Sequence, residues 1–530
     1  MKIEIYDTTL RDGAQGAGID FTDDNKREII VALDKLGVSY IEVGNAASPA
    51  DASILREIEK IQLKNACLVT FCATRRAGRD ADDDPALAFA AECAAPCVTV
   101  VGKASRYQVE HVLATTPEEN LSMIHDTIEF LRSRGKRIFF DAEHFFDGYG
   151  DDPTYALTVL RTAHDAGAER LILCDTNGGM LPDVIGVVVN AVHTRLPEVS
   201  LGIHCHDDMG MAVAGSAEAV ISGAVQVQGT ISGIGERCGN CNLSTIIPIL
   251  QLKLGFSCVT EAQLASLTRL SRRITEAANL SFNEHSPFVG GYAFTHKAGM
   301  HIDAVRKRPR TFEHIAPELV GNSSDLLISG MAGKSAYQAV LERIAPELHV
   351  EAGTEQFDAV IAKIREYESR GFQFENAEAS LLLVVREALG IRRRYFELLT
   401  FRVMVGEPMS VNPNSLDAAF IKVAVPDPAD GGGGTREEFA AAEGFGPVNA
   451  LDCALRRALS NSYPSLSEVR LSDYKVRVLD SASNTTASSV RVLIESTNGT
   501  SVWRTVGVSV DIVDASWQAL RDSIEYYLSL

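Results

Sequence analysis

Short apolar runs alternate with longer amphipathic stretches through the first half of the chain. The short runs are rich in aliphatic and β-branched residues, which is typical of buried strands. Eight of them can be placed, at Ile3–Asp7, Tyr40–Val43, Leu68–Cys72, Val98–Val101, Arg137–Asp141, Leu171–Cys174, Leu201–His206 and Val225–Gln228. Strands that alternate with helices favour parallel pairing with right-handed crossovers, and eight such units in roughly 250 residues predict a (β/α)8 TIM barrel.

The stretches between these runs carry the start and stop signals of helices. Thr22, Thr116 and Asp152 each precede a segment of apolar periodicity, and proline or acidic residues follow each of them in the first turn. Such residues satisfy or complement the free N–H groups at a helix N-terminus. Gly37 and Gly135 stand where two of these helices should end.

A doubly wound open sheet would also alternate strands with helices. The polar residues suited to chemistry follow the first, second, fifth, sixth, seventh and eighth predicted strands, always at the carboxyl end. A closed barrel gathers the carboxyl ends of its strands around one mouth, which explains this distribution better. The barrel is therefore the favoured α/β fold.

The pattern changes twice beyond the predicted barrel. Residues 263–392 are mainly helical, and we expect an accessory region that supplies residues to the site. Residues 393–530 contain two segments of similar α+β plan, which suggests an internal duplication. Their predicted elements are strands around Glu397–Val405 and Ala418–Val425 before a helix at Val448–Ser460, then strands around Tyr474–Leu479, Ser489–Glu495 and Trp503–Asp511 before a helix at Ser516–Leu528. We therefore expect three domains, at 1–262, 263–392 and 393–530.

Length and charge narrow the class of protein. The chain has 530 residues, too many for one core, and a net charge of −20 at pH 7. No nucleic acid partner is expected, because the overall field would repel a phosphate backbone. The N-terminus lacks a secretory segment and no apolar run reaches the ~20 residues of a bilayer span, so we expect a cytoplasmic protein without a membrane partner. The ten cysteines are expected to be reduced thiols.

Two histidines on one predicted strand suggest a metal centre. His204 and His206 are two residues apart, so both side chains point to the same face of the seventh strand. The eighth strand would lie beside the seventh and close against the first, which brings Asp12 and Asn240 to the same rim. Two nitrogen and two oxygen ligands suit a divalent Mn, Mg, Co or Zn ion with positions left open for substrate. The alternative is a hydrogen-bonded histidine pair without a metal.

Other polar residues at this rim are candidates for substrate chemistry. Arg11 is always charged, so it could stabilise an oxyanion or form a structural salt bridge. Asp141 and Glu143 end the fifth strand, where their carboxylates could orient a base or the substrate. Thr176 follows the sixth strand and could donate a hydrogen bond to a substrate carboxylate or cap the next helix.

Several segments resemble a known enzyme family. They are Asp7–Gly13, His204–His206 and Gly235–Asn240, supported by Asp141–Tyr149, Cys174–Gly179, Val227–Thr230, Gly446–Asp452 and Val506–Trp517. Together they look like the metal-dependent acyltransferases that condense acetyl-CoA with α-keto acids, and nearly the whole chain resembles the citramalate synthases of that family. The metal-site segments are shared with the isopropylmalate and homocitrate synthases, whereas the aromatic-rich segment and the tail are more specific.

The resemblance implies a Claisen condensation of acetyl-CoA with pyruvate or a related α-keto acid. The keto acid would chelate the ion beside Arg11, and His301 would remove a methyl proton from acetyl-CoA. Glu143 and Thr176 would contact the keto acid or support the base, and hydrolysis of the thioester would then release (R)-citramalate and CoA. The resemblance also implies a role in isoleucine biosynthesis, a homodimer paired through an allosteric domain at 393–530, and isoleucine as the feedback effector there.

Departures from the family pattern leave alternatives open. The stretch after the second strand lacks the usual tryptophan, and Asp207 and Gly215 stand where asparagine is usual. A synthase for a different α-keto acid, making 2-isopropylmalate, homocitrate or another 2-alkylmalate, is therefore one alternative. An acyl-CoA lyase of the same barrel family is another, although such lyases generally lack the long C-terminal region. A non-catalytic amino-acid sensor is disfavoured because the full set of metal-site residues is present.

Overall fold

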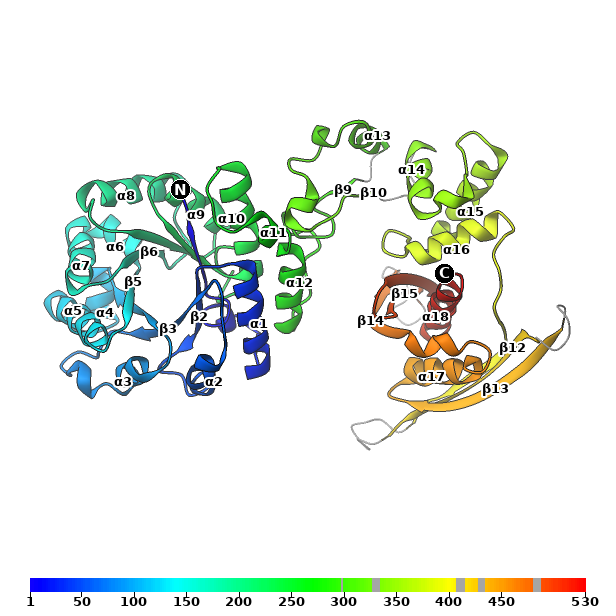
Figure 1. Ribbon diagram of the computed structural model, residues 1–530, viewed down its shortest axis with the longest axis horizontal. Helices are drawn as coiled ribbons and strands as arrows, with labels where there is room; N and C mark the ends of the chain where they lie inside the picture. The colour runs from blue at the N-terminus through cyan, green and yellow to red at the C-terminus, as the bar shows by residue number, and fades with distance from the viewer. Residues whose placement is uncertain (297–298, 327–333, 407–414, 428–433, 480–487) are drawn as a thin grey trace. The chain divides into compact units, whose positions relative to one another are not determined.

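A closed barrel of eight parallel strands forms the first part of the chain, as predicted (Figure 1). The computed structural model describes all residues except 297–298, 327–333, 407–414, 428–433 and 480–487. The strands follow one another in chain order, and the first pairs with the eighth to close the ring. They are β1 (Glu4–Asp7), β2 (Tyr40–Asn45), β3 (Cys67–Ala73), β4 (Cys97–Lys103), β5 (Arg137–Glu143), β6 (Arg170–Asp175), β7 (Leu201–Cys205) and β8 (Gln226–Gly229). Every predicted strand is confirmed, with ends that differ by one or two residues.

Helices cover the outer surface of the barrel (Figure 1). The first begins after Thr22, whose hydroxyl accepts a hydrogen bond from the backbone N–H of Asn25, and ends at Gly37 with a left-handed φ of 87°. Thr116 and Asp152 likewise cap the helices that follow them. The barrel helices are α1 (Asp23–Leu36), α2 (Ala52–Glu57), α3 (Pro85–Glu92), α4 (Arg106–His111), α5 (Pro117–Ser133), α6 (Phe145–Asp151), α7 (Pro153–Ala166), α8 (Pro182–Arg195), α9 (Ala212–Ile221) and α10 (Leu243–Pro248), followed by α11 (Glu261–Leu264) and α12 (Leu267–Ala277).

Large side chains fill the inside of the barrel toward its amino end. Tyr6, Tyr40 and Phe139 pack there with aliphatic and cysteine side chains from neighbouring strands. The rings of Tyr40 and Phe139 meet edge to face with centroids 4.9 Å apart. Because this end is packed solid, polar chemistry inside the barrel is confined to the carboxyl ends of the strands.

Contacts divide the chain into two compact units. The first contains Met1–Thr295 and Glu313–Asp325, and the second contains His296–Phe312 and Leu326–Leu530. Beyond the barrel the chain forms α13 (Gly299–Lys307), α14 (Lys334–Ile344), α15 (Glu355–Ser369) and α16 (Glu378–Ala388), and two short strands, β9 (Thr295–His296) and β10 (Asp325–Leu326), pair with each other. The domain bounds of 1–262, 263–392 and 393–530 remain predictions.

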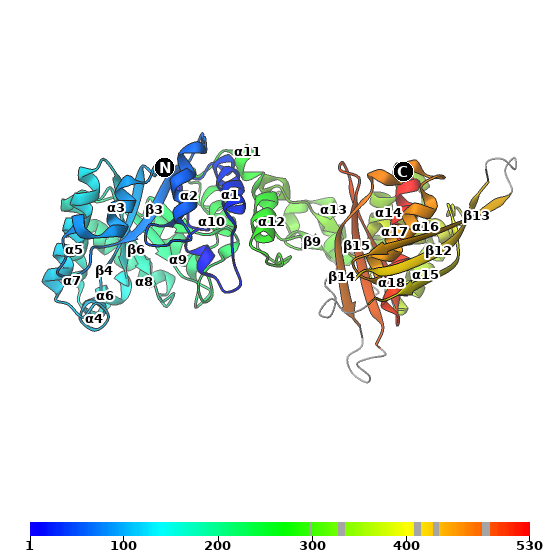
Figure 2. The same ribbon diagram turned by 90° about the horizontal axis from the view of Figure 1, so that it is seen from below.

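The C-terminal region has two halves of one plan, each with three antiparallel strands followed by a helix (Figure 2). They consist of β11 (Glu397–Met404), β12 (Asp417–Pro426), β13 (Thr435–Gly444) and α17 (Pro447–Leu459), then β14 (Arg470–Val478), β15 (Val490–Thr497), β16 (Val502–Ser509) and α18 (Ile512–Leu528). Each helix packs against the sheet that precedes it. The sequence prediction missed β13 because its first residues are charged and its outer face is exposed, so no apolar run marks it.

The ten cysteines are free thiols, as expected. Among the helices of the described ranges, none has the length and apolar character needed to cross a bilayer.

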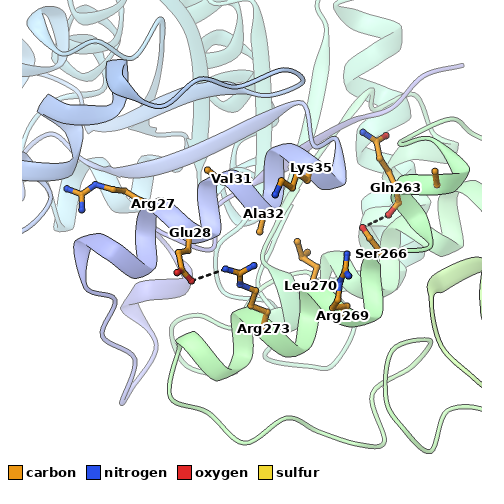
Figure 3. Close-up of a pocket in the computed structure, with 11 residues that line it drawn as sticks. Arg27, Glu28, Val31, Ala32, Lys35, Gln263, Ser266, Arg269, Leu270 and Arg273 are labelled. Carbon is orange, nitrogen blue, oxygen red and sulfur yellow. Dashed lines mark hydrogen bonds and ion pairs between the residues drawn. The ribbon is translucent and has the colours of Figure 1, made fainter. Parts of the chain in front are cut away.

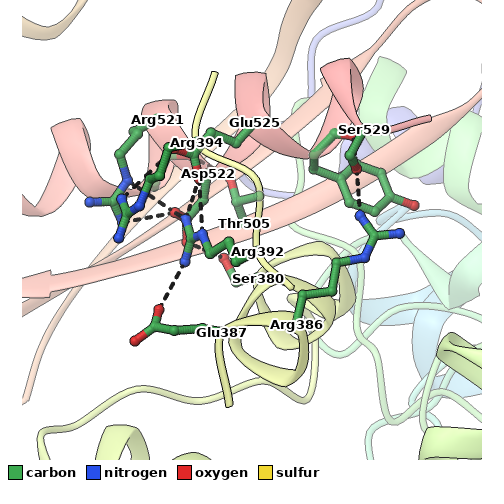
Figure 4. Close-up of polar contacts among 12 residues, drawn as sticks. Ser380, Arg386, Glu387, Arg392, Arg394, Thr505, Arg521, Asp522, Glu525 and Ser529 are labelled. Carbon is green, nitrogen blue, oxygen red and sulfur yellow. Dashed lines mark hydrogen bonds and ion pairs between the residues drawn. The ribbon is translucent and has the colours of Figure 1, made fainter. Parts of the chain in front are cut away.

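A buried ion-pair network joins the segment after α16 to α18 (Figure 4). Arg392, with a side chain only 5% exposed, donates from Nε to Glu525 Oε2 at 3.1 Å and from Nη2 to Asp522 Oδ1 at 2.8 Å. Ser380 of α16 donates to the other oxygen of Asp522 at 3.1 Å. The side chain of Glu525 is fully buried, so Arg392 supplies the charge that offsets its desolvation.

Replacing Arg392 with leucine should destabilise the second unit by about 3 kcal/mol, because the fully buried Glu525 would lose its closest counter-charge and Asp522 would keep only Arg521 as an ionic partner. Urea unfolding followed by circular dichroism measures the loss. The matched control is Arg394→Leu, since the Arg394 side chain is 56% exposed and lies 3.8 Å from Glu525 Oε1. We expect the control to change the free energy of unfolding by about 1 kcal/mol or less. Equal losses in both variants would contradict a specific role for Arg392.

Candidate metal centre and active site

Three side chains from distant parts of the sequence converge at the barrel mouth. Nε2 of His204 lies 3.4 Å from Asp12 Oδ2, and Nε2 of His206 lies 3.9 Å from the same oxygen. The possible ligand atoms of all three residues lie within 4.8 Å of one another. The two histidines share one face at the end of β7, as their spacing predicts, and Asp12 follows β1 across the closure of the barrel. These three side chains therefore form a possible metal site.

Asn240 joins this group from the loop after β8. Its backbone forms a bridge with His206, its side-chain amide donates a hydrogen bond to the carbonyl oxygen of Ile234 at 3.3 Å, and its side chain lowers the pKa of Asp12. The side-chain carbonyl Oδ1 is buried and has no hydrogen-bond partner in the part of the chain that the structure describes. A buried oxygen without a donor is costly, and a cation at this position would satisfy it. The structure thus brings all four predicted ligands together, and their donor atoms fit a divalent ion.

The electrostatics of this group favour the protonation states that metal binding requires. Burial raises the pKa of Asp12, but the charge of Arg11, together with the two histidines when they are protonated at low pH, outweighs it and holds the pKa below its ordinary value. Burial lowers the pKa of His204, and burial together with the neighbouring His204 lowers the pKa of His206 to about 4. Near neutral pH the imidazoles are therefore uncharged and the carboxylate is ionised, which are the metal-binding forms.

Arg11 is held by a buried carboxylate that the sequence analysis did not single out. Nε of Arg11 lies 2.6 Å from Oε2 of Glu42, and the guanidinium lies 4.1 Å from the centroid of the Phe71 ring. Two hydroxyl groups, from β1 and the turn after it, also donate to Glu42. Nη1 of Arg11 lies 3.6 Å from Asp12 Oδ2. The expected salt bridge is therefore present, and it fixes the guanidinium beside the possible metal site.

Glu143 and Thr176 lie at the carboxyl ends of β5 and β6, at the same mouth. Oε2 of Glu143 lies 2.5 Å from Nζ of Lys103 at the end of β4, a partner that the sequence did not indicate. The hydroxyl oxygen of Thr176 accepts a hydrogen bond from the backbone N–H of His144 at 2.8 Å. Thr176 thus ties the loops after β5 and β6 together and does not cap α8, which begins after Leu181. Substrate contacts by Glu143 and Thr176 remain predictions.

The predicted base, His301, lies on α13 in the second unit. Its ring stacks on Phe312 with centroids 4.2 Å apart. The other predicted site residues belong to the first unit. The role of His301 therefore remains a prediction that rests on the resemblance.

A groove of about 800 Å³ lies on the outer face of the barrel, between α1 and α12 (Figure 3). Its walls carry Arg27, Lys35, Arg269 and Arg273, and Arg273 pairs with Glu28 at 3.0 Å. None of the predicted catalytic or metal-binding residues lines this groove. The candidate active site is therefore the polar cluster inside the mouth.

Known proteins match this chain over nearly its whole length. An (R)-citramalate synthase of Geobacter sulfurreducens is 45% identical over 527 residues, which cover 99% of this chain and 97% of that protein. The (R)-citramalate synthases of Aquifex aeolicus and Streptomyces coelicolor are each 43% identical and cover 99% of this chain, with 98% and 96% of their own lengths matched. The chain belongs to the (R)-citramalate synthase family.

Three domain families account for most of the chain. The HMGL-like family matches residues 2–274, the homocitrate synthase post-HMGL domain-like family matches 288–371, and the LeuA allosteric (dimerisation) domain matches 375–528. The resemblance to citramalate synthases and the predicted fold class, a TIM barrel with helical and C-terminal α+β regions, are thus confirmed.

Two residues that depart from the citramalate synthase pattern make contacts at helices. Asp207 Oδ1 accepts a hydrogen bond from the backbone N–H of Ala212 at 2.9 Å, at the start of α9. A Cβ on Gly215 would lie 2.6 Å from Cδ1 of Ile185, so glycine allows α8 and α9 to pack closely. Both residues therefore have structural contacts at α9.

Proposed function

We propose that this chain condenses acetyl-CoA with pyruvate and hydrolyses the resulting thioester, giving (R)-citramalate and CoA. The proposal rests on the four polar residues that meet at the barrel mouth in a chain that matches (R)-citramalate synthases over nearly its whole length. The proposed cofactor is a divalent Mn, Mg, Co or Zn ion held by Asp12, His204, His206 and Asn240.

The residues at the mouth divide the chemistry among them. The bound ion would act as a Lewis acid on the keto group. Arg11, fixed by Glu42, donates hydrogen bonds to the keto oxygen as negative charge develops on it, and Thr176 donates to the keto-acid carboxylate. His301 removes a proton from the methyl group of acetyl-CoA, and the resulting carbanion attacks the keto carbon. Water then cleaves the thioester to release CoA.

Chelation and a substrate screen test this function. EDTA treatment should abolish CoA release from acetyl-CoA and pyruvate, and added Mn²⁺ should restore it. Among pyruvate, 2-ketoisovalerate, 2-ketoglutarate and oxaloacetate, we expect pyruvate to have the highest kcat/KM by about tenfold or more, because a pocket fitted to a methyl group excludes larger side chains. A thiol reagent that detects free CoA measures all four rates. Full turnover after exhaustive chelation would contradict the metal centre, whereas preference for another keto acid would contradict only the choice of pyruvate.

The C-terminal domain supports a proposal about regulation. Its match to the LeuA allosteric (dimerisation) domain supports a homodimer that pairs through residues 375–528. Isoleucine is the proposed effector of this domain, because the resemblance to citramalate synthases extends over the whole chain. Feedback by this amino-acid product would couple a site in the C-terminal domain to the active site in the barrel. The proposed biological role is isoleucine biosynthesis.

A further inference from the structure

A histidine binds a cation only through a ring nitrogen that carries no proton. In a neutral imidazole one nitrogen holds the proton and the other holds the lone pair. Nε2 of His204 faces Asp12, and the opposite nitrogen, Nδ1, lies 3.0 Å from the amide oxygen of Gln228. An amide oxygen only accepts hydrogen bonds, so this contact places the proton on Nδ1 and leaves the lone pair of Nε2 facing the metal site.

The orientation of the Gln228 amide is set from its other side. Nε2 of Gln228 donates a hydrogen bond to Oδ1 of Asp141 at 3.1 Å. Gln228 is fully buried on β8, and Asp141 is 4% exposed near the end of β5. A flipped amide would turn its oxygen toward the oxygen of Asp141 and its NH2 group toward His204. Because Oδ1 of Asp141 accepts whether or not the other oxygen carries a proton, the same amide orientation serves both states of the carboxyl group.

We propose that Asp141 and Gln228 form a positioning relay that fixes the tautomer and the ring orientation of His204 for metal binding. The inference rests on the proposed metal centre. Metal-binding histidines commonly donate their second N–H to a carboxylate or carbonyl, and here the amide of Gln228 carries that constraint from Asp141. His206 differs, since its Nδ1 is buried without a hydrogen-bond partner in the described ranges. The relay therefore makes His204 the preorganised histidine of the pair.

Strand β8 provides a matched control for Gln228. Gln226 lies two residues earlier, so its side chain points to the same inner face, and it too is fully buried. It pairs in register with Gly202, whereas Gln228 pairs with His204. Nε2 of Gln226 donates to Glu4 Oε2 at 3.2 Å, toward the amino end of the barrel. Gln226→Leu thus removes an equivalent buried amide without touching the relay.

The first measurement is Mn²⁺ affinity of the full-length protein by calorimetry. Gln228→Leu should weaken binding about 10–100-fold, whereas Gln226→Leu should bind Mn²⁺ as the wild type does. The double variant Gln228→Glu with Asp141→Asn exchanges the amide and the carboxylate, so it keeps an oxygen acceptor opposite Nδ1 of His204 and a donor between positions 141 and 228. It should restore most of the affinity and remains informative if the leucine variant folds poorly. Equal weakening by Gln228→Leu and Gln226→Leu, or by Gln228→Leu and the double variant, would overturn the relay.

The second measurement reads the tautomer without metal. Nitrogen-15 spectra of metal-free protein labelled at histidine should show His204 with its proton on Nδ1, assigned by loss of the signal in His204→Gln. Gln228→Leu should convert this signal into a mixture of tautomers. A proton on Nε2 in the wild type would overturn the relay even if Mn²⁺ binds. A wild type with the Nδ1 proton but no Mn²⁺ binding would instead overturn the proposed metal centre, and with it the function assigned to the relay.

Discussion

Replacing Asp12 with alanine should eliminate detectable Mn²⁺ binding and lower kcat/KM for pyruvate by about 10³-fold or more. Asp12 is the one carboxylate among the four proposed ligands, and its Oδ2 faces Nε2 of both His204 and His206. Without it, two neutral imidazoles and an amide oxygen remain, a donor set with no negative charge for a divalent cation. Lewis-acid polarisation contributes several kcal/mol to such reactions, and each 1.36 kcal/mol changes the rate tenfold.

Calorimetry with Mn²⁺ and the CoA-release assay measure the two effects on one sample. Asp34→Ala is the control, because Asp34 is also a buried carboxylate but lies toward the amino end of the barrel. Its Oδ1 accepts hydrogen bonds from the backbone N–H groups of Lys64, Asn65 and Ala66 at 3.0, 2.7 and 2.9 Å. The control should lose stability while it keeps Mn²⁺ binding. An Asp12→Ala enzyme with wild-type activity would exclude Asp12 as an essential ligand.

The barrel and its metal-site residues could be predicted because both follow periodic rules. Each strand lies between amphipathic helices, so a short apolar run bounded by helix signals marks it. The spacing of His204 and His206 fixes their shared face, and the closure of β8 on β1 brings Asp12 beside them. These two predictions depend only on the two-residue period of a strand and on the rule that the active site of a barrel lies at the carboxyl ends of its strands.

The partners of these residues could not be predicted, because they depend on how side chains meet inside the barrel. Glu42 is the charged residue within the predicted strand at Tyr40–Val43, which is a usable signal of a functional carboxylate. The ion pair between Glu42 and Arg11 depends on the relative stagger of β1 and β2. Gln228 bridges β7 and β5 across the interior, a contact between residues that no sequence spacing relates. Strand β13 was missed for a different reason, since an exposed charged strand lacks an apolar run.

Replacing His301 with alanine should lower kcat by about 10²–10⁴-fold, the usual contribution of a general base, while Mn²⁺ affinity stays unchanged. The affinity should survive because the four proposed ligands belong to the first unit and His301 belongs to the second. Steady-state CoA release gives kcat, and calorimetry gives the affinity. Acetyl-CoA deuterated at the methyl group adds a sharper readout, since proton removal becomes rate-limiting without its base and the isotope effect on kcat should increase.

The control for this prediction is His314→Ala. His314 also lies against phenylalanine rings, with centroids 5.1 Å from Phe288 and 5.9 Å from Phe294, but it belongs to the first unit. If loss of an aromatic contact were the cause of lost turnover, both variants would lose it, whereas a base at His301 predicts loss in one alone. Wild-type kcat in His301→Ala would exclude His301 as the base. A parallel loss of Mn²⁺ affinity and kcat would assign His301 to the metal site, because removal of a base slows proton transfer but leaves the binding of the ion intact.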